Sequence, residues 1–355
     1  MTLSGAVATT PDLLRLVAVP VLAWTAVRDV KTRRISSGVW IPLGALGALL
    51  LAWDGWLAWS ASGDAWAREF LLPVAVSLGF VVPIAYLFWW VGGFGGADAK
   101  ALMVVALLFP AFPAFDLGSR TFPLTSTPIE TFSFTILTNA VVVGLAIPIA
   151  LAVANAAAGR IGLVSLVGWP VSWRRIPTTH GKLLETPDGR GLGRGGLDLD
   201  ALRMYLRWRG ATFAELRRDP ATYRDPKSLP AEPNPPTDGA VDAANAVPDG
   251  GEPVDGLERN GDDREDENGS VTLEFDLEAV ASDAEYDDPW GAAAFLEDIE
   301  GTAYGTTPEA LRDGLDVLAE KDRVWITPGT PFLVPIFVGL LIALVYGDLL
   351  IGLLF

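Results

Sequence analysis

The chain has 355 residues, of which 50% are hydrophobic and 19% are charged, and its formal net charge is -17. Cysteine is absent and His180 is the only histidine, which excludes thiol catalysis, disulfides and Cys/His zinc sites. A chain of this length that is so apolar and carries so few charges is typical of a membrane protein.

The negative charge is concentrated in one hydrophilic segment. Residues 232–323 contain 27 acidic and 5 basic residues, so the rest of the chain has a balance of +5. A dense carboxylate shell keeps a protein hydrated in a high-salt cytoplasm, and a halophilic source is one interpretation of this segment. Intrinsic disorder would give the same composition. No nucleic-acid partner is expected.

Six apolar runs have about the length that a membrane-spanning helix needs. They cover residues 12–28, 39–59, 70–91, 99–115, 132–158 and 332–355. The first and fourth are short, and we expect Arg15 in the first to extend its charge outward to the membrane interface. The prediction is an all-α membrane protein with six transmembrane helices and a large acidic, partly disordered cytoplasmic insert between helices 5 and 6.

Lysine and arginine set the expected orientation, because they accumulate in cytoplasmic loops. They follow the first, third and fifth apolar runs, as Arg28, Lys31, Arg33, Arg34, Lys100, Arg160, Arg174 and Arg175. Both termini are therefore expected outside a cell membrane, with the first, third and fifth loops on the cytoplasmic side.

The composition divides the chain into five predicted parts. Residues 1–158 form a membrane domain, and residues 331–355 form the last transmembrane helix. Between them, 159–218 is an interfacial segment whose residues 197–218 have the spacing of a basic amphipathic helix. The acidic linker 219–270 has too little apolar surface to offset its chain entropy and is predicted to be disordered. A small acidic segment, 271–330, includes a short strand predicted over 271–277.

Two aspartates lie at the cytoplasmic edges of apolar runs: Asp29 follows the first run and Asp98 precedes the fourth. An ionisable group at such a position is costly, and its default interpretation is functional. The intervening helices can bring both carboxyls into one site, where they would hold a single proton between them. The ionised member would take a proton from water and the protonated member would polarise a carbonyl. This is peptide hydrolysis without a metal or organic cofactor.

Helix position suggests a role for each member of the pair. Asp98 begins a helix, where the macrodipole favours the anion, and Asp29 ends one, where the anion is disfavoured. This argument assigns Asp98 as the base and Asp29 as the acid at rest. Gly95 and Gly96 allow positive φ before Asp98 and close approach of an extended substrate.

Two strings of residues resemble the two signature sites of type IV prepilin peptidases, and in particular of the archaeal prepilin and preflagellin peptidases. They are Asp29-x-Lys31-x-Arg33-x-Ile35 and Gly95-Gly96-Ala97-Asp98-Ala99-Lys100. The resemblance implies catalytic residues Asp29 and Asp98, supported by Gly95, Gly96, Lys100, Lys31 and Arg33. It also implies an aspartic endopeptidase of the membrane. Such an enzyme would cleave class III signal peptides of prepilin-like or preflagellin-like precursors on the cytoplasmic side, ahead of their hydrophobic segment.

The resemblance extends to Trp325-Ile326-Thr327-Pro328, Pro331-Phe332 and Pro335 before the last run. The chain departs from the family pattern at Ala97, where glycine is expected, and at Ser36-Ser37. It also lacks the cysteine tetrad and methylating region of many bacterial relatives, so no methyltransferase activity is predicted.

Other interpretations of these residues are open. Asp29 could be an interfacial carboxylate paired with Lys31 or Arg33, and Asp98 could be an ordinary helix N-cap. The basic residues after the first run could fix the orientation of the chain in the membrane or contact anionic lipids of the bilayer. A presenilin-like protease that cuts within a membrane span, or a six-span transporter with an aspartate proton relay, would use the same pair. Pilin and archaellin precursors both fit as substrates.

Overall fold

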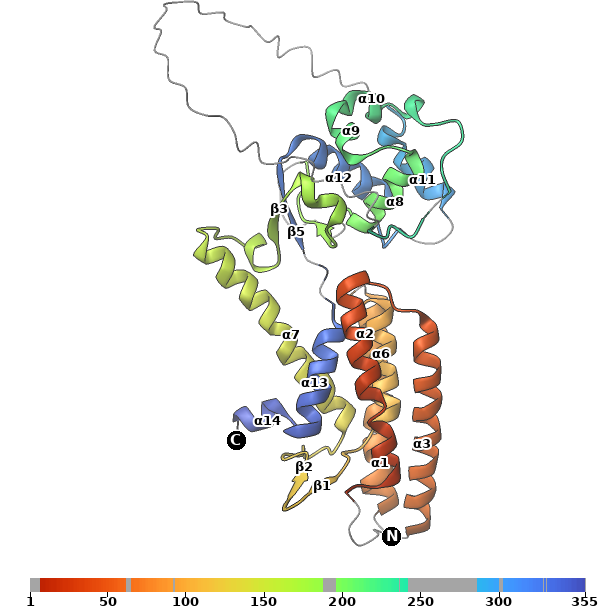
Figure 1. The fold of residues 1–355 in the computed structure, drawn as a ribbon, viewed down its shortest axis with the longest axis vertical. Helices are drawn as coiled ribbons and strands as arrows, with labels where there is room; N and C mark the ends of the chain where they lie inside the picture. The colour runs from red at the N-terminus through yellow and green to blue at the C-terminus, as the bar shows by residue number, and fades with distance from the viewer. Residues whose placement is uncertain are drawn as a thin grey trace, which may run out of the picture. The chain divides into compact units, whose positions relative to one another are not determined.

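The structure, a computed structural model, describes residues 7–61, 65–91, 93–187, 196–235, 237–241, 286–299, 303–327, 329 and 331–354. It divides into two compact units (Figure 1). The helical unit combines Met1–Ile161 with Thr330–Phe355, and the insert unit is Gly162–Gly329.

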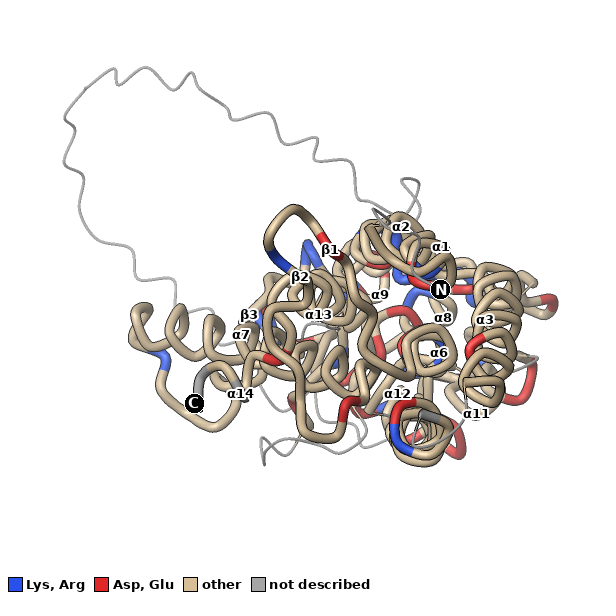
Figure 2. Tube along the Cα trace, turned by 90° about the horizontal axis from the view of Figure 1, so that it is seen from below, with Lys and Arg blue, Asp and Glu red and all other residues tan. Residues whose placement is uncertain are grey.

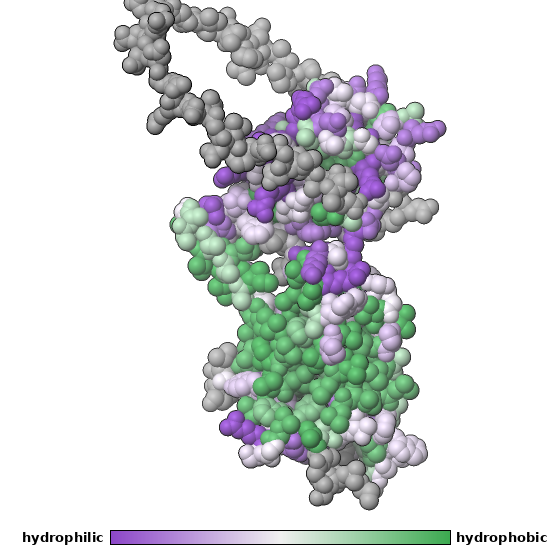
Figure 3. Space-filling model, in the orientation of Figure 1, coloured by the Kyte–Doolittle hydropathy of each residue, from purple (hydrophilic) through white to green (hydrophobic). Residues whose placement is uncertain are grey.

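The helical unit is built mainly from apolar helices, and its surface in Figure 3 is mostly hydrophobic. Its helices are α1 Thr10–Arg15, α2 Ala18–Thr32, α3 Trp40–Ala61, α4 Leu72–Val76, α5 Val82–Trp90, α6 Gly96–Leu108, α7 Phe132–Ala157, α13 Leu333–Val345 and α14 Leu349–Leu354. Segments of π-helix, Ala65–Leu71 and Ser77–Val81, flank α4, and a 3-10 turn, Ser37–Val39, precedes α3. A two-stranded antiparallel hairpin, β1 Phe115–Leu117 and β2 Arg120–Phe122, follows α6.

Three described helices are long and apolar enough to cross a membrane: Ser37–Ala61, Trp66–Trp90 and Phe132–Ala157. They correspond to the second, third and fifth predicted spans. Helices α7 and α13 carry no charged residue along their length, and α7 can be followed as a tan tube in Figure 2. Helix α13 is apolar but shorter than these three.

The remaining predicted spans are shorter or interrupted in the structure. The first is split into α1 and α2 at residues 16–17, and α6 ends at Leu108 because Phe109 leaves the helical region and Pro110 follows. The last is broken before α14 at Gly347, which has a φ of 104°. Residues 109–115 and 346–348 are therefore corrections to the predicted helix boundaries. The total of six spans stays a prediction.

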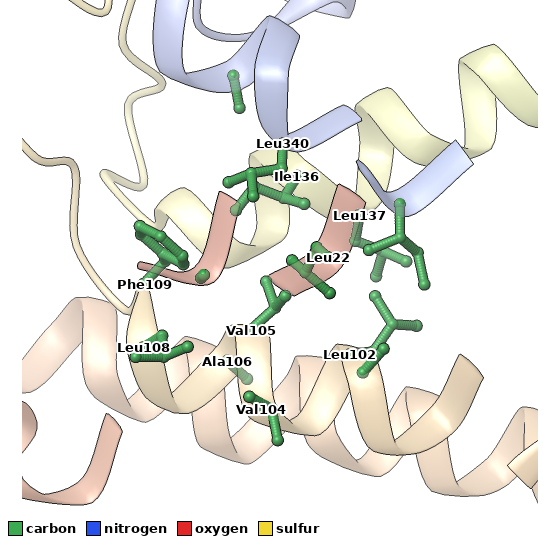
Figure 4. Close-up of a cluster of buried hydrophobic side chains, with 14 of the residues drawn as sticks. Leu22, Leu102, Val104, Val105, Ala106, Leu108, Phe109, Ile136, Leu137 and Leu340 are labelled. Carbon is green, nitrogen blue, oxygen red and sulfur yellow. The ribbon is translucent and has the colours of Figure 1, made fainter. Parts of the chain in front are cut away.

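Helix α6 is central in the helical unit and contacts α3, α5, α7 and α13. Leu102 and Val105 of α6 meet Leu22 of α2 and Ile136 of α7 in a buried cluster (Figure 4). Helix α13 packs against α7 so closely that a Cβ at Gly339 would lie 2.8 Å from the backbone nitrogen of Ala140. Helix α13 also contacts α2 and α6, and its first residue, Leu333, lies near the end of α2 and the start of α6.

Arg15 does not extend outward, contrary to the sequence prediction. Its side chain is buried, with one guanidinium nitrogen 2.8 Å from Asp12 Oδ1 and another donating to Asp54. Its Nε donates to the Leu108 carbonyl at 2.5 Å. The cluster ties α1, α3 and α6 together, because two acidic partners and a helix-end carbonyl satisfy the one guanidinium.

The insert unit contains a three-stranded antiparallel sheet in the order β3 Trp169–Ser172, β5 Arg323–Thr327, β4 Lys182–Leu183. Its helices are α8 Leu199–Arg209, α9 Phe213–Arg218, α10 Pro220–Arg224, α11 Ala292–Asp298 and α12 Pro308–Glu320. Single turns of 3-10 helix occur at Val164–Leu166, Pro226–Ser228 and Pro289–Gly291, and a longer one at Trp173–Thr178. The all-α prediction missed these strands and the hairpin.

The core of the insert unit joins residues from both sides of the acidic segment. Tyr205 and Trp208 of α8 pack on Phe295 of α11, with ring centroids 5.6 and 5.4 Å apart. Tyr205 also donates a hydrogen bond to the Trp290 carbonyl at 2.7 Å. The structure therefore groups the predicted segments 159–218 and 271–330 into one unit. The apolar side of the predicted amphipathic helix is buried in protein, and this helix is two helices, α8 and α9.

Part of the predicted disordered linker has a defined fold. Residues 219–235 include α10, and Arg209 of α8 lies over the Tyr223 ring at 5.1 Å and donates to Ser228. Such contacts supply the order that composition alone did not predict. Residues 242–285, and with them most of the predicted linker and the predicted strand 271–277, lie outside the described residues.

Candidate active site

Three helix ends of the helical unit meet at the two aspartates. Asp29 lies in the last turn of α2 and is 8% exposed, and Asp98 lies half-buried in the first turn of α6. The backbone N–H of Leu333, the first residue of α13, lies near enough to both carboxyls to lower the pKa of each. The structure thus brings together two residues that are 69 positions apart in the sequence.

The end of α2 is shaped by Arg33. This residue adopts the left-handed conformation, with φ 56° and ψ 20°, and its N–H donates to the Asp29 carbonyl at 2.9 Å. A non-glycine residue in this region is uncommon, and the conformation ends the helix after Thr32, within one turn of the aspartate. The positive charge of Arg33 acts on both carboxyls and favours their ionised forms.

The start of α6 holds Asp98 through a local cap. Gly95 is the N-cap, and its N–H donates to Asp98 Oδ2 at 3.1 Å. Asp98 is therefore the third residue of the first turn rather than the N-cap itself. The φ of Gly95 is -67°, which any residue can adopt, so the expected positive φ is wrong at this position. What Gly95 supplies is space, because a Cβ there would lie 3.0 Å from Asp98 Oδ2.

Substituting Gly95 and Gly96 in turn with alanine tests whether Gly95 is needed for the space that it leaves beside Asp98 or for the flexibility of the backbone. We expect Gly95→Ala to displace the Asp98 carboxyl and lower the rate of peptide cleavage by roughly tenfold to a hundredfold, because small misplacements of a catalytic group are costly. Gly96→Ala is the matched control, since its Cβ would lie 3.8 Å from Trp89 Nε1, an ordinary contact. Initial cleavage rates of the two variants test this expectation, and equal rates would contradict it.

The predicted supporting lysines lie away from the carboxyls. Lys100 Nζ donates to Ser37 Oγ at 2.7 Å, which links α6 to the turn before α3. Ser37 is one of the residues at which the chain departs from the family pattern. Lys31 is exposed on the outer side of α2. The hydrogen bond from Lys100 to Ser37 therefore fixes the connection between α2, which carries Asp29, and α3.

A stack of aromatic rings adjoins the pair and was not predicted. Phe94 lies between Phe88 and Phe332, with ring centroids 5.0 and 4.8 Å away. Phe94 precedes Gly95, and Phe332 precedes Leu333, so the stack fixes the start of α13 against the loop that holds Asp98. In the sequence, only the string Pro331-Phe332, which is part of the family resemblance, had drawn attention to a residue of this stack.

The environment raises the pKa of both carboxyls, which lie just outside the predicted spans 12–28 and 99–115. Burial and then the negative charge of Asp29 raise the pKa of Asp98 to about 7, against the opposing effects of the Gly95 N–H, Arg33 and the Leu333 N–H. Burial also raises the pKa of Asp29, while Arg33 and the Leu333 N–H oppose the rise.

Both shifts favour a proton shared by the pair at higher pH than free carboxyls would hold it. The added effect of the Asp29 charge favours Asp98 as its carrier, which is opposite to the assignment made from helix position. Which carboxyl holds the proton at rest stays a prediction. One protonated and one ionised carboxyl can act together as acid and base on a water molecule and a carbonyl. Within the residues described, no group of three or more His, Asp or Glu side chains could hold a metal ion.

Comparison with known proteins gives two family matches. Residues 16–149 match the model of the Type IV leader peptidase family, and residues 266–349 match the model described as Archaeal Peptidase A24 C-terminus Type II. A preflagellin peptidase from Methanococcus voltae is 31% identical over 138 residues, which are 38% of this chain and 54% of that protein. The chain thus spans about half the length of this curated relative.

Proposed function

Because the chain belongs to the type IV leader peptidase family, we propose that it is an aspartic endopeptidase that removes the leader from prepilin-like or preflagellin-like precursors. The observation that carries the proposal is that Asp29 and Asp98, at the ends of two helices, lie close enough for the charge of Asp29 to act on Asp98, with the Leu333 N–H near both. The similar preflagellin peptidase supports the class of substrate.

In the proposed reaction the Asp29 carboxylate takes a proton from a water molecule, and the oxygen of that water attacks the scissile carbonyl. Protonated Asp98 donates its proton to the carbonyl oxygen, which gives a neutral tetrahedral intermediate. Collapse of the intermediate breaks the C–N bond. Asp29 passes its proton to the leaving amine, and Asp98 recovers its own from the intermediate hydroxyl, so the pair is restored.

We place the cleavage at the cytoplasmic side of the cell membrane, ahead of the hydrophobic segment of the precursor. The distribution of lysine and arginine supports this orientation, with both termini outside. The position of the pair at helix ends also supports it, because a water-consuming site at an edge of the bilayer is accessible to an extended peptide. A presenilin-like protease would instead cut within an apolar span.

The direct test is to incubate membranes that contain the full chain with a preflagellin-like or prepilin-like precursor and to sequence the N-terminus of the product. The proposal predicts one new N-terminus, ahead of the apolar segment. A product cut inside the apolar segment would favour the presenilin-like alternative. An unchanged precursor together with proton transport would favour the transporter.

The pH dependence of cleavage should follow the proton on Asp98. Because this proton is the general acid, kcat/KM should fall by about tenfold per pH unit above about pH 7. It should also fall on the acidic side, where Asp29 becomes protonated. Arg33→Gln removes a charge that favours both anions, so both limbs should move to higher pH.

The control for this profile is Arg160→Gln, which removes an exposed cation at the end of α7. Its profile should match that of the unchanged protein. A flat profile from pH 6 to about pH 9 would contradict the acid role of Asp98.

A further inference from the structure

An apolar groove runs along the helical unit between α2 and the start of α3. It has a volume of about 520 Å³, and its lining side chains are all apolar. They include Val17, which directly precedes α2, Val21 and Trp24 of α2, and Val39, Leu43 and Leu46 on the other side. A groove of this kind on a membrane protein is a place where an acyl chain fits between helices.

Helix α2 presents two different faces to its surroundings. Asp29 is buried with Leu22 and Ala26 on one face, toward the core of the helical unit. Val17, Val21 and Trp24 recur at intervals of three or four residues and therefore share another face, which lines the groove. Neither Asp29 nor Asp98 lines the groove, so a chain bound in the groove does not contact the pair.

The groove face continues into two basic residues. Arg28 and Lys31 extend the same helical spacing beyond Trp24, and both are exposed. The guanidinium of Arg28 lies over the Trp24 ring at 5.5 Å, and its Nε donates to the Arg34 carbonyl at 3.1 Å. Along this face of α2, the apolar groove is followed by a tryptophan and then by two cations. A phospholipid has its groups in the matching order, with an acyl chain, a glycerol at the membrane interface and a phosphate.

We propose that this groove binds one acyl chain of an anionic phospholipid of the bilayer and that Arg28 and Lys31 hold its phosphate. Charge complementarity is the reason for an anionic lipid, because the two cations stand where the headgroup of a lipid in the groove would lie. A zwitterionic lipid would fill the groove but gain less from the cations. The site is independent of the peptidase reaction.

The test measures lipid retention by native mass spectrometry of the full chain, titrated with phosphatidylglycerol or with phosphatidylcholine of identical acyl chains. We expect phosphatidylglycerol to be retained more strongly. The double variant Arg28→Gln/Lys31→Gln should weaken its binding roughly 25-fold, since each basic residue near an anionic lipid contributes about a factor of five. Arg160→Gln, which removes another exposed cation of the helical unit, should leave binding unchanged.

A second pair of variants tests the groove itself. Val21→Trp fills the groove and should reduce binding of phosphatidylglycerol, whereas Leu49→Trp, at a residue of α3 that is 70% exposed and outside the groove, should not. A phosphatidylglycerol with a photoreactive acyl chain should label α2 and the start of α3 ahead of other apolar helices.

Four results would overturn the proposal. Three of them are equal retention of the two lipids, unchanged binding in the double variant, and labelling spread evenly over all apolar helices. If an apolar peptide of the precursor labels the groove and displaces the phospholipid, the occupant is a protein segment and the proposal is wrong. None of these experiments measures peptide cleavage. A negative result in them therefore rejects the lipid site without rejecting the proposed peptidase activity, and absence of that activity does not reject the lipid site.

Discussion

Replacing either aspartate with asparagine should reduce precursor cleavage by about 10³-fold or more, because each carboxyl is half of an acid–base pair. Asparagine keeps the shape of the side chain, so it removes the titrating proton with little change in packing. With Asp98→Asn no group donates to the carbonyl oxygen, and with Asp29→Asn no group takes the proton from water. Initial rates in reconstituted membranes measure the loss.

The control for this loss is Asp116→Asn in β1, an exposed carboxyl of the same unit that accepts a hydrogen bond from Thr121 at 2.6 Å. It should cleave at the unchanged rate. All three variants should insert into the membrane and unfold at similar temperatures, which separates chemistry from folding. An Asp29→Asn variant that retains more than a tenth of the activity would exclude the proposed mechanism.

The second large effect concerns stability rather than activity. Arg15→Leu should destabilise the helical unit by about 3 kcal/mol, because removal of one partner leaves buried charges uncompensated. Asp12 and Asp54 would lose their common cation, and the Leu108 carbonyl at the end of α6 would lose its donor. Unfolding of the purified protein in mixed micelles, followed by tryptophan fluorescence, measures the change.

A rescue variant distinguishes charge from packing in this cluster. When Asp12→Asn and Asp54→Asn are combined with Arg15→Leu, no charge remains, and most of the lost stability should return. Asp116→Asn added to Arg15→Leu is the control and should restore nothing. If Arg15→Leu alone is as stable as the unchanged protein, the cluster makes no net contribution to the fold.

The apolar helices were predictable because their patterns are local. The run 132–158 corresponds to α7 within one residue, since a continuous apolar stretch needs no distant partner to be recognised. Interruptions were harder to predict. The break at Gly347 depends on a positive φ, and the end of α6 at Leu108 depends on how Phe109 and Pro110 continue toward the hairpin.

The insert unit was less predictable because its core is non-local. Trp290 and Phe295 pack on Tyr205 and Trp208 across a long acidic stretch of sequence. Composition alone favours disorder for such a stretch, and no short window contains both halves of the core. The strand pair β3 and β5 has the same origin, with Val171 opposite Val324.

The sequence predicted which two aspartates form the candidate site, but not what surrounds them or how their pKa values are shifted. Asp29 and Asp98 were identified from their positions at the edges of apolar runs and from the two strings. Leu333, whose backbone N–H lies near both carboxyls, belongs to another helix, and nothing in its own residue type suggests a polar role. Helix position alone could not assign the proton, because burial, which the sequence does not report, has the largest effect on the pKa of Asp98.

The central claim is that Asp29 and Asp98 share one site, and the absence of native cysteine allows a direct measurement. A chain with Asp29→Cys and Asp98→Cys is treated with the shortest bifunctional methanethiosulfonate and cut at a protease site placed between α3 and Ala65–Leu71. We predict that the two fragments remain linked, whereas an Arg28→Cys/Asp98→Cys chain, with its first cysteine on the groove face of α2, separates. Linkage of the second chain and not of the first would contradict the shared site.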